Sequence, residues 1–318
     1  MTTGRRGGRG RTARAWSAAA LCVPALAGCS AQAVADGGGE GGGPGGRPAA
    51  TGTAGATGKA RPRPSATPLR SLPGAHVNIA DGQTVGVGMP VSVTFDRPIP
   101  VAGRAGVERQ LKVTAAAEGS WGWVRDRNLV DGQRVDFRPR RYWKPGTAVT
   151  VRAGAGITRH FTVGRSLVAT VDVRTHFMTL ETAGSSRRVP ITAGAPGMDT
   201  WNGTMVVSDK AAKVFMNSRS VGFGDAYADY YYYYAVHLTA SGTYLHQNPK
   251  ANVYGGRRNV THGCVGLAVG GPAKRFFDEV VPGDVVKVVG SRDTVAVGNG
   301  YGDWNLPWEQ WRATSALG

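Results

Sequence analysis

The sequence predicts a mainly β protein with two folded domains behind an extended N-terminal region. Short runs of alternating hydrophobic and polar residues begin near residue 75 and restart near Arg165. Only "GPAKRFFDEVV", residues 271–281, has a persuasive helical period. The chain from residue 75 onward, about 245 residues, is long enough for two domains.

The first 28 residues have the composition of an export signal. Five arginines and no acidic residue occupy residues 1–14, and the fourteen residues that follow are uncharged. That stretch is shorter than the ~20 apolar residues of a spanning helix. Its last three residues and the cysteine that follows form "LAGC", residues 26–29, which resembles the lipobox of bacterial lipoproteins. The resemblance implies cleavage before Cys29 and lipidation of Cys29, which would anchor the protein outside the cytoplasm, facing the cell wall. An ordinary secretory signal with a chance cysteine is the alternative.

Residues 29–74 are predicted to form a disordered tether. Between Gly37 and Gly58, 11 of the 22 residues are glycine, and "KARPRPSATP" then stiffens the chain. Such a composition cannot bury a core. We therefore expect this segment to hold the folded part away from the membrane, within reach of the wall.

The positive charge favours an acidic partner outside the cell. The net charge is +17, and removal of the five signal arginines would leave about +12. Anionic lipid headgroups and anionic wall polymers are suitable partners. Nucleic acid is not expected, because no recognition-helix or zinc-finger pattern accompanies the charge. A solvated basic surface is the alternative.

Residues 75–164 are predicted to form an immunoglobulin-like β-sandwich. "VSVTFDRPI" and "VDFRP" alternate, and "KPGTAVTVRAG" is typical of a turn that leads into a strand. No helical period is present in this domain. Trp121, Trp123 and Trp143 are expected to pack in the core or between domains, with a sugar-stacking platform as the alternative.

Residues 165–290 are predicted to form a second β-rich domain, and residues 291–318 a C-terminal segment. Residues 271–281 provide its one persuasive helix, followed by the strand "VVKVVG". The tyrosine run 230–234 should point rings to both faces of a strand, either into the core or as a wall that stacks on substrate. The segment 304–311 carries three tryptophans and should pack back on a domain surface.

Cys264 would be an unpaired thiol in an oxidising compartment once Cys22 and Cys29 are accounted for. A nucleophilic thiol needs a base, because the thiolate is the attacking species. His262 lies two residues before Cys264, and His246 ends the preceding β-segment.

Gly263 would let backbone amides approach a substrate oxyanion. Two other interpretations of this cluster remain. The cysteine could be buried and inert. It could also join His246 and His262, with His237, in a zinc site, although no second cysteine or carboxylate has the usual ligand spacing.

The arrangement His-x15-His-Gly-Cys, preceded by Thr261, resembles the catalytic motif of L,D-transpeptidases of the YkuD type. "PITAGAPGMDTWNGTMVV" and "PGDVVKVVG" are similar to other segments of that family, and "GDWNLPWEQW" is similar to the C-terminal segment of its lipoprotein members. The resemblance covers about residues 75–313. It implies an immunoglobulin-like sandwich, then a YkuD-type β-sandwich catalytic domain with one short helix and a C-terminal tail packed back on it.

The resemblance also implies roles for the residues at the motif. Cys264 would be the nucleophile and His246 the general base, oriented by the backbone carbonyl of Gln247. His262, Gly263 and the Cys264 amide would shape the acyl-binding loop.

Three further residues would contact the donor peptide: Ser241, Gly242 and the lid tyrosine Tyr227. Gly266 is a departure, because the family usually has Asn or Arg there, a polar side chain expected to contact substrate.

The implied reaction is acyl transfer on peptidoglycan. A thioester on Cys264 would form from a tetrapeptide stem and be captured by the amine of a neighbouring stem, giving a 3→3 cross-link. Carbapenems would acylate Cys264, and no metal or organic cofactor would be needed. A hydrolase that passes the thioester to water, and a non-catalytic wall-binding module, are the alternatives.

Overall fold

The computed structural model describes residues 69–126, 129, 132–217, 219 and 230–318, which belong to one compact unit. The predicted signal peptide, Cys29, most of the tether and Tyr227 lie outside the described residues. No helix within the described ranges is long and apolar enough to cross a membrane.

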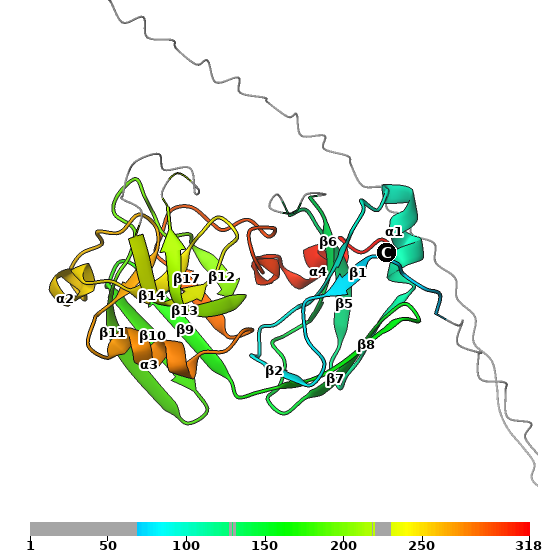
Figure 1. The fold of residues 1–318 in the computed structure, drawn as a ribbon, viewed down its shortest axis with the longest axis horizontal. Coiled ribbons are helices and arrows are strands. Elements are labelled where there is room, and N and C mark those ends of the chain that lie inside the picture. The colour runs from blue at the N-terminus through cyan, green and yellow to red at the C-terminus, as the bar shows by residue number, and fades with distance from the viewer. Residues whose placement is uncertain (1–68, 127–128, 130–131, 218, 220–229) are drawn as a thin grey trace, which may run out of the picture. The chain divides into compact units, whose positions relative to one another are not determined.

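The first domain is a sandwich of two sheets, as predicted (Figure 1). One sheet has the order β1-β3-β6-β5 and the other β2-β8-β7-β4. The strands are β1 (Ala75–Val77), β2 (Gln83–Val85), β3 (Val91–Phe95), β4 (Leu111–Thr114), β5 (Gly119–Val124), β6 (Arg134–Pro139), β7 (Ala148–Ala153) and β8 (Ile157–Val163). Trp121, Trp123 and Trp143 are buried in its hydrophobic core, which confirms their predicted packing role.

This domain also contains a helix, α1 (Val101–Glu108), where the sequence shows no helical period. Glycines interrupt the segment, and no side chain caps its N-terminus, so local propensity for a helix is weak. Glu108 is buried at its end and accepts hydrogen bonds from Trp123 Nε1 at 3.2 Å, Ser315 Oγ at 2.5 Å and Ala316 N at 2.7 Å. These tertiary contacts stabilise the end of the helix.

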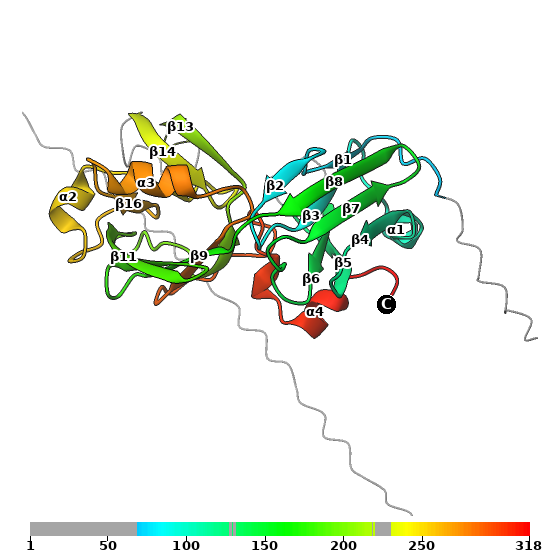
Figure 2. The ribbon, with the colours of Figure 1, turned by 90° about the horizontal axis from the view of Figure 1, so that it is seen from below.

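The second domain is built on one long sheet with the order β12-β17-β9-β10-β11-β16-β15-β14-β13. β11 pairs with β10 through residues 185–190 and with β16 through residues 191–192, so it joins two halves of the sheet. Figure 2 shows these halves as two layers, with β14 in one and β9 in the other. The strands are β9 (Leu167–Asp172), β10 (Phe177–Thr182), β11 (Ser185–Thr192), β12 (Gly203–Val206), β13 (Asp209–Met216), β14 (Tyr230–His237), β15 (Tyr244–Gln247), β16 (Val265–Leu267) and β17 (Val285–Val289).

The predicted helix of this domain is present as α3 (Pro272–Glu279). It packs against β14 and β15 and buries Phe276 in the core of the domain. A second, shorter helix, α2 (Lys250–Tyr254), follows β15 directly. It has only five residues, too few for a helical period to be recognised in the sequence.

The C-terminal segment packs back on the folded part, but from Gly300 onward it lies mainly on the first domain rather than on the second, which corrects its predicted placement. It contains the 3-10 helix η2 (Asp303–Asn305) and α4 (Trp308–Arg312). Trp311 is fully buried and donates to Ser120 O at 3.0 Å, while Trp304 donates to Gly88 O at 2.9 Å. Asn305 turns to the second domain and bonds both the amide and the carbonyl of Thr204. Residues earlier in the segment also contact that domain, as in the bond between Asn299 and Ser241.

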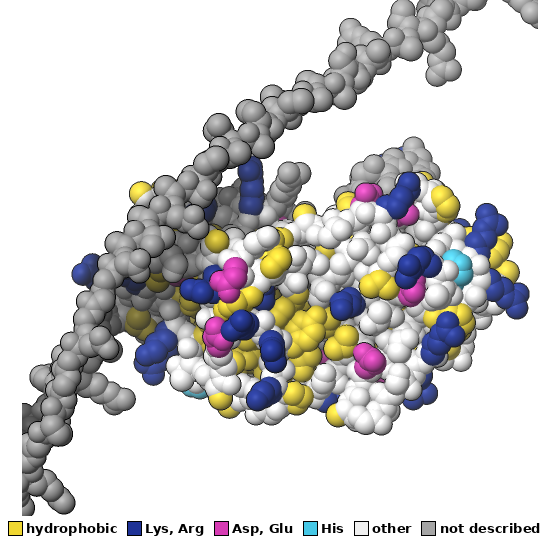
Figure 3. Space-filling view, turned by 180° about the vertical axis from the view of Figure 1, so that it is seen from behind, with side chains coloured by type: hydrophobic (Ala, Val, Ile, Leu, Met, Phe, Trp, Pro, Cys, Tyr) yellow, Lys and Arg dark blue, Asp and Glu magenta, His cyan; other side chains and the backbone are white. Residues whose placement is uncertain are grey.

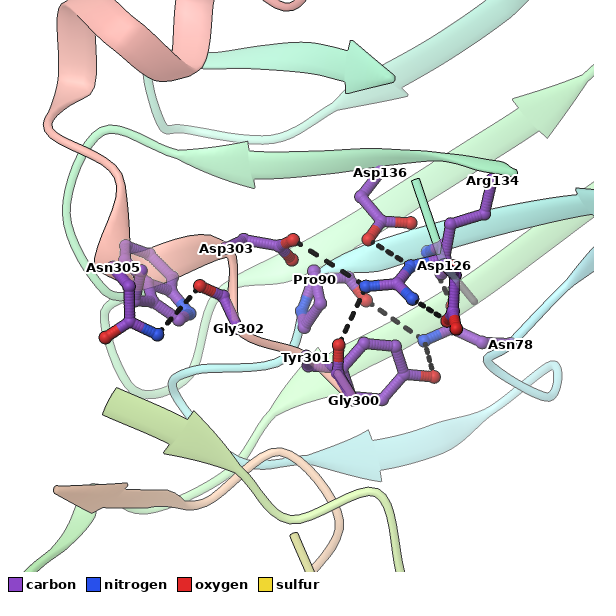
Figure 4. Close-up of polar contacts among 12 residues, drawn as sticks. Asn78, Pro90, Asp126, Arg134, Asp136, Gly300, Tyr301, Gly302, Asp303 and Asn305 are labelled. Atoms are coloured by element: carbon purple, nitrogen blue, oxygen red, sulfur yellow. Dashed lines mark hydrogen bonds and ion pairs between the residues drawn. The ribbon is translucent and has the colours of Figure 1, made fainter. Parts of the chain in front are cut away.

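A buried group of charged residues fastens this segment to the first domain (Figure 4). Arg134 forms ion pairs with Asp126 and Asp136 and donates to Gly300 O at 2.8 Å. Asp303 lies 3.9 Å from Arg134 and is completely buried. Burial, and then the nearby charge of Asp136, raise the pKa of Asp303 well above its usual range. Burial at this position therefore favours the protonated form of Asp303.

The two domains also touch through bare backbone. Gly86 N donates to Pro282 O and Gly88 N donates to Gly283 O, both at 2.8 Å. A Cβ on Gly86 would lie 2.2 Å from Asp284 N, and one on Gly283 would lie 2.5 Å from Gly86 N. Only glycine fits at these positions.

On the face shown in Figure 3, charged side chains are dispersed rather than collected in one patch. On the face in Figure 3, Lys and Arg side chains are spread widely, and several lie beside Asp or Glu. This distribution is typical of a solvated basic surface.

Candidate active site

The sheet brings the motif residues together at the ends of two parallel strands. β15 pairs in parallel with β16, and His246 lies level with Gly266. Cys264 immediately precedes β16, in the loop 261–264. Parallel pairing therefore places this loop beside the strand that carries His246, although Cys264 lies 18 positions after His246 in the sequence.

His246 is a buried, neutral imidazole with a fixed orientation. Its side chain is 3% exposed, and Nδ1 donates to Gln247 O at 2.7 Å, as predicted. Nε2 is then the nitrogen that carries the lone pair. Burial lowers the pKa of His246 to about 4, and the bond to Gln247 opposes this only in part. The ring edge of Tyr232 packs against it, with centroids 4.5 Å apart.

The Cys264 thiol is protonated in this environment. Burial raises its pKa to about 11, and a bond from the backbone amide of Tyr244 lowers it only partly. Sγ donates to Gly242 O at 3.6 Å, a bond that only the thiol form can make. Burial therefore favours the uncharged forms of both groups, a thiol and a neutral imidazole, which line the same cavity.

The loop that carries the thiol is held in an unusual conformation. Gly263 has φ +113°, a region that residues with a Cβ rarely adopt. Thr261 Oγ1 donates to Cys264 O at 2.5 Å, and Thr261 N donates to Ala193 O at 3.0 Å. His262 is partly buried, and both burial and the charge of Lys250 lower its pKa.

These residues line a cavity of about 560 Å³. Of the residues predicted from the sequence, Cys264, His246, His262, Gly263, Ser241 and Gly242 all face it. Ser241 is fixed by Asn299, which accepts from its amide at 2.9 Å and donates to its hydroxyl at 2.8 Å.

Gly266 does not line this cavity. It lies buried in β16, where an added Cβ would be 2.9 Å from Asn248 Cβ and 3.0 Å from Thr192 Cγ2. The side chain of Asn248 therefore occupies the space above Gly266, and Asn248 does line the cavity.

The tyrosine run has members in both of its predicted environments. Tyr230 and Tyr232 line the cavity, whereas Tyr234 packs on Phe277 of α3. Asn248 and Lys250 also line the cavity, and no motif in the sequence indicated them. Asn248 and Lys250 follow the histidine strand closely, and that proximity was the one available signal.

No group of three or more His, Cys, Asp or Glu side chains is arranged to hold a metal ion in the described part of the chain. His237 lies apart from the cavity lining. Its ring bonds Asp209 at 2.9 Å and Thr239 O at 2.7 Å and stacks on Tyr244 at 4.3 Å.

Comparison with known proteins identifies both domains. The bacterial Ig domain family matches residues 62–156, and the L,D-transpeptidase catalytic domain family, YkuD, matches residues 166–288. L,D-transpeptidase 2 of Mycobacterium tuberculosis (strain CDC 1551 / Oshkosh) is 33% identical over 261 residues, 76% of this chain and 62% of that protein. The chain thus spans less than two thirds of this relative.

Other relatives are covered more fully. L,D-transpeptidase 1 of Mycobacterium tuberculosis (strain H37Rv) is 35% identical over 230 residues, 70% of this chain and 88% of that protein. A solved structure of the L,D-transpeptidase LdtMt1 in complex with imipenem has a TM-score of 0.61 and 32% identity, and the match covers 69% of this chain and all of that one. The chain therefore belongs to the L,D-transpeptidase family, with a bacterial immunoglobulin-like domain ahead of a YkuD catalytic domain.

Proposed function

We propose that this protein is a peptidoglycan L,D-transpeptidase that forms 3→3 cross-links through a thioester on Cys264. One observation carries the proposal: a buried neutral imidazole, His246, is oriented by Gln247 O and shares a cavity with an unpaired thiol. Membership in the family supports the same chemistry.

In the first half-reaction, His246 Nε2 takes the Sγ proton as sulfur attacks the carbonyl carbon of the third residue of a tetrapeptide stem. The oxyanion would be stabilised by the amides of Gly263 and Cys264. The C–N bond to the terminal D-alanine then breaks, and the imidazolium returns its proton to the departing amine. Because burial disfavours both charged forms, we expect proton transfer to accompany the attack rather than precede it.

In the second half-reaction, the side-chain amine of a neighbouring stem attacks the thioester carbonyl. His246 accepts the amine proton and delivers it to sulfur, so an amide forms and the thiol is restored. Water in place of the amine would make the enzyme a carboxypeptidase.

Intact-mass analysis after incubation with a carbapenem tests the nucleophile. We expect an adduct of one drug mass on the wild type and none on Cys264→Ala. His246→Gln should slow adduct formation by a factor of about 100 or more, whereas His160→Gln, an exposed histidine of the first domain, should not. Absence of an adduct on the wild type would favour a wall-binding module.

Product analysis with tetrapeptide stems then separates the two enzymatic outcomes. A cross-linked dimer with release of D-alanine indicates transpeptidation. Release of D-alanine without a dimer would establish hydrolysis instead.

We also propose that the protein is exported and anchored to the membrane by lipid on Cys29, facing the wall. The sequence "LAGC" supports this. Cys29→Ala should move the protein from the membrane fraction to the soluble extracytoplasmic fraction; an unchanged distribution would contradict the anchor.

A further inference from the structure

The chain directly after the base strand forms one wall of the catalytic cavity. β15 ends at Gln247, and Asn248, Pro249 and Lys250 all line the cavity that contains Cys264. Lys250 is only three residues after Gln247, the last residue of the strand. The position of Lys250 is therefore tied to that of His246, the proposed base.

Asn248 fixes the geometry of this wall. Its backbone N–H donates to Leu267 O at 2.8 Å, and its side-chain Oδ1 accepts from Lys250 N at 3.0 Å. Its Cβ sits in the space that Gly266 leaves open. With Oδ1 occupied by that turn, the Nδ2 group donates no hydrogen bond to any described residue, and it remains available to a ligand.

Lys250 supplies a positive charge to a cavity that also carries the carboxylates of Asp199 and Asp293. Its ammonium forms no ion pair with any described residue, and the side chain is exposed. By contrast, Asp199, a carboxylate on the same cavity, is paired with Arg292. Lys250 is close enough to lower the pKa of His262, beside the reacting thiol. An anionic group of a ligand in this cavity would therefore meet a cation near the reaction centre.

We propose that Lys250, assisted by the Asn248 amide, binds a carboxylate of the donor stem peptide and so selects stems that carry it. This inference rests on the proposed function and names its substrate class. An ammonium and an amide N–H₂ are both donors suited to a carboxylate. Two carboxylates of a stem could fill the role: that of the terminal D-alanine, and that on the side chain of a diaminopimelate-type third residue.

Turnover of matched tetrapeptides by the full-length protein tests the inference and separates the two sources. One peptide has both carboxylates free, one has the terminal carboxylate amidated, and one has the side-chain carboxylate amidated. In the wild type, amidating the carboxylate that Lys250 binds should lower kcat/KM about 5-fold, the effect of a solvent-exposed ion pair. Lys250→Met should lower kcat/KM for the free peptide equally and remove the effect of that amidation.

Asn248→Ala should weaken the same discrimination. Lys287→Met, an exposed lysine of β17 outside the cavity, should leave all three rates unchanged. Raising the salt concentration should reduce the preference of the wild type. If each amidation changes kcat/KM by the same factor in the wild type and in Lys250→Met, Lys250 binds neither carboxylate. The inference then fails, while the proposed transpeptidase function is unaffected. If the wild type turns over none of the stems, the proposed function itself fails.

Discussion

Introducing an asparagine at position 266 should destabilise this protein. In Gly266→Asn, the new Cβ would lie 2.9 Å from Asn248 Cβ and 3.0 Å from Thr192 Cγ2 before the rest of the side chain is placed. Both neighbours are anchored close to the backbone, and Thr192 is fully buried, so neither can swing away. Overpacking of this kind costs about 2–3 kcal/mol.

For a protein of this size, that cost corresponds to a fall in Tm of about 5–10 °C. Thermal unfolding followed by circular dichroism would measure it. Gly156→Asn is a matched control, because nothing lies within 4 Å of a Cβ there. The double variant Gly266→Asn/Asn248→Gly should recover part of the loss, since one of the two close contacts is removed. A Tm of Gly266→Asn within 1 °C of the wild type would refute the packing argument.

Three further outcomes are expected. As the pH is lowered, the rate of carbapenem acylation should fall with a midpoint near pH 4, because burial lowers the pKa of His246 to about 4 and protonation removes the base. A midpoint near 6.5 in a pH–rate profile would contradict a buried base. Asp303→Asn should become more stable relative to the wild type as pH rises from 4 to 8 in urea titrations, because the raised pKa of Asp303 means that the wild type loses stability as pH rises toward that value; a parallel pH dependence would contradict this. Glu108→Ala should lower the free energy of unfolding in urea by about 3 kcal/mol, since it leaves buried donors such as Trp123 Nε1 unpaired. A loss below 1 kcal/mol would contradict a stabilising role of Glu108.

Local patterns in the sequence were sufficient for the strands, for α3 and for the central motif. Alternation of hydrophobic and polar residues indicates which side chains of a strand are buried. The motif of His246, His262 and Cys264 lies within 19 consecutive residues, so its spacing can be recognised in the sequence. The helix α1 was not predictable, because Glu108 is held by residues of the C-terminal segment, about 200 positions away.

The part of the cavity wall formed by Asn248 and Lys250 was not predictable for a related reason. Whether Gly266 faces substrate depends on its level in the parallel pairing of β15 and β16, which the sequence does not encode locally. That pairing places the side chain of Asn248 over Gly266 and leaves Asn248 and Lys250, rather than position 266, on the cavity. Tyr227 lies outside the described residues, and its predicted role stays a prediction.

The backbone contact between the two domains has a consequence for mutational surveys. At Gly86, Gly88 and Gly283 there is no side chain to remove, so a scan that truncates residues would pass over this junction without a signal. Substitution to alanine, normally the mildest change, is here an addition of volume at 2.2–2.5 Å from neighbouring backbone at Gly86 and Gly283. A saturation library should therefore show Gly86 and Gly283 as intolerant of every replacement, a signature usually associated with catalytic residues. Distance from Cys264, rather than intolerance alone, would tell the two kinds of site apart.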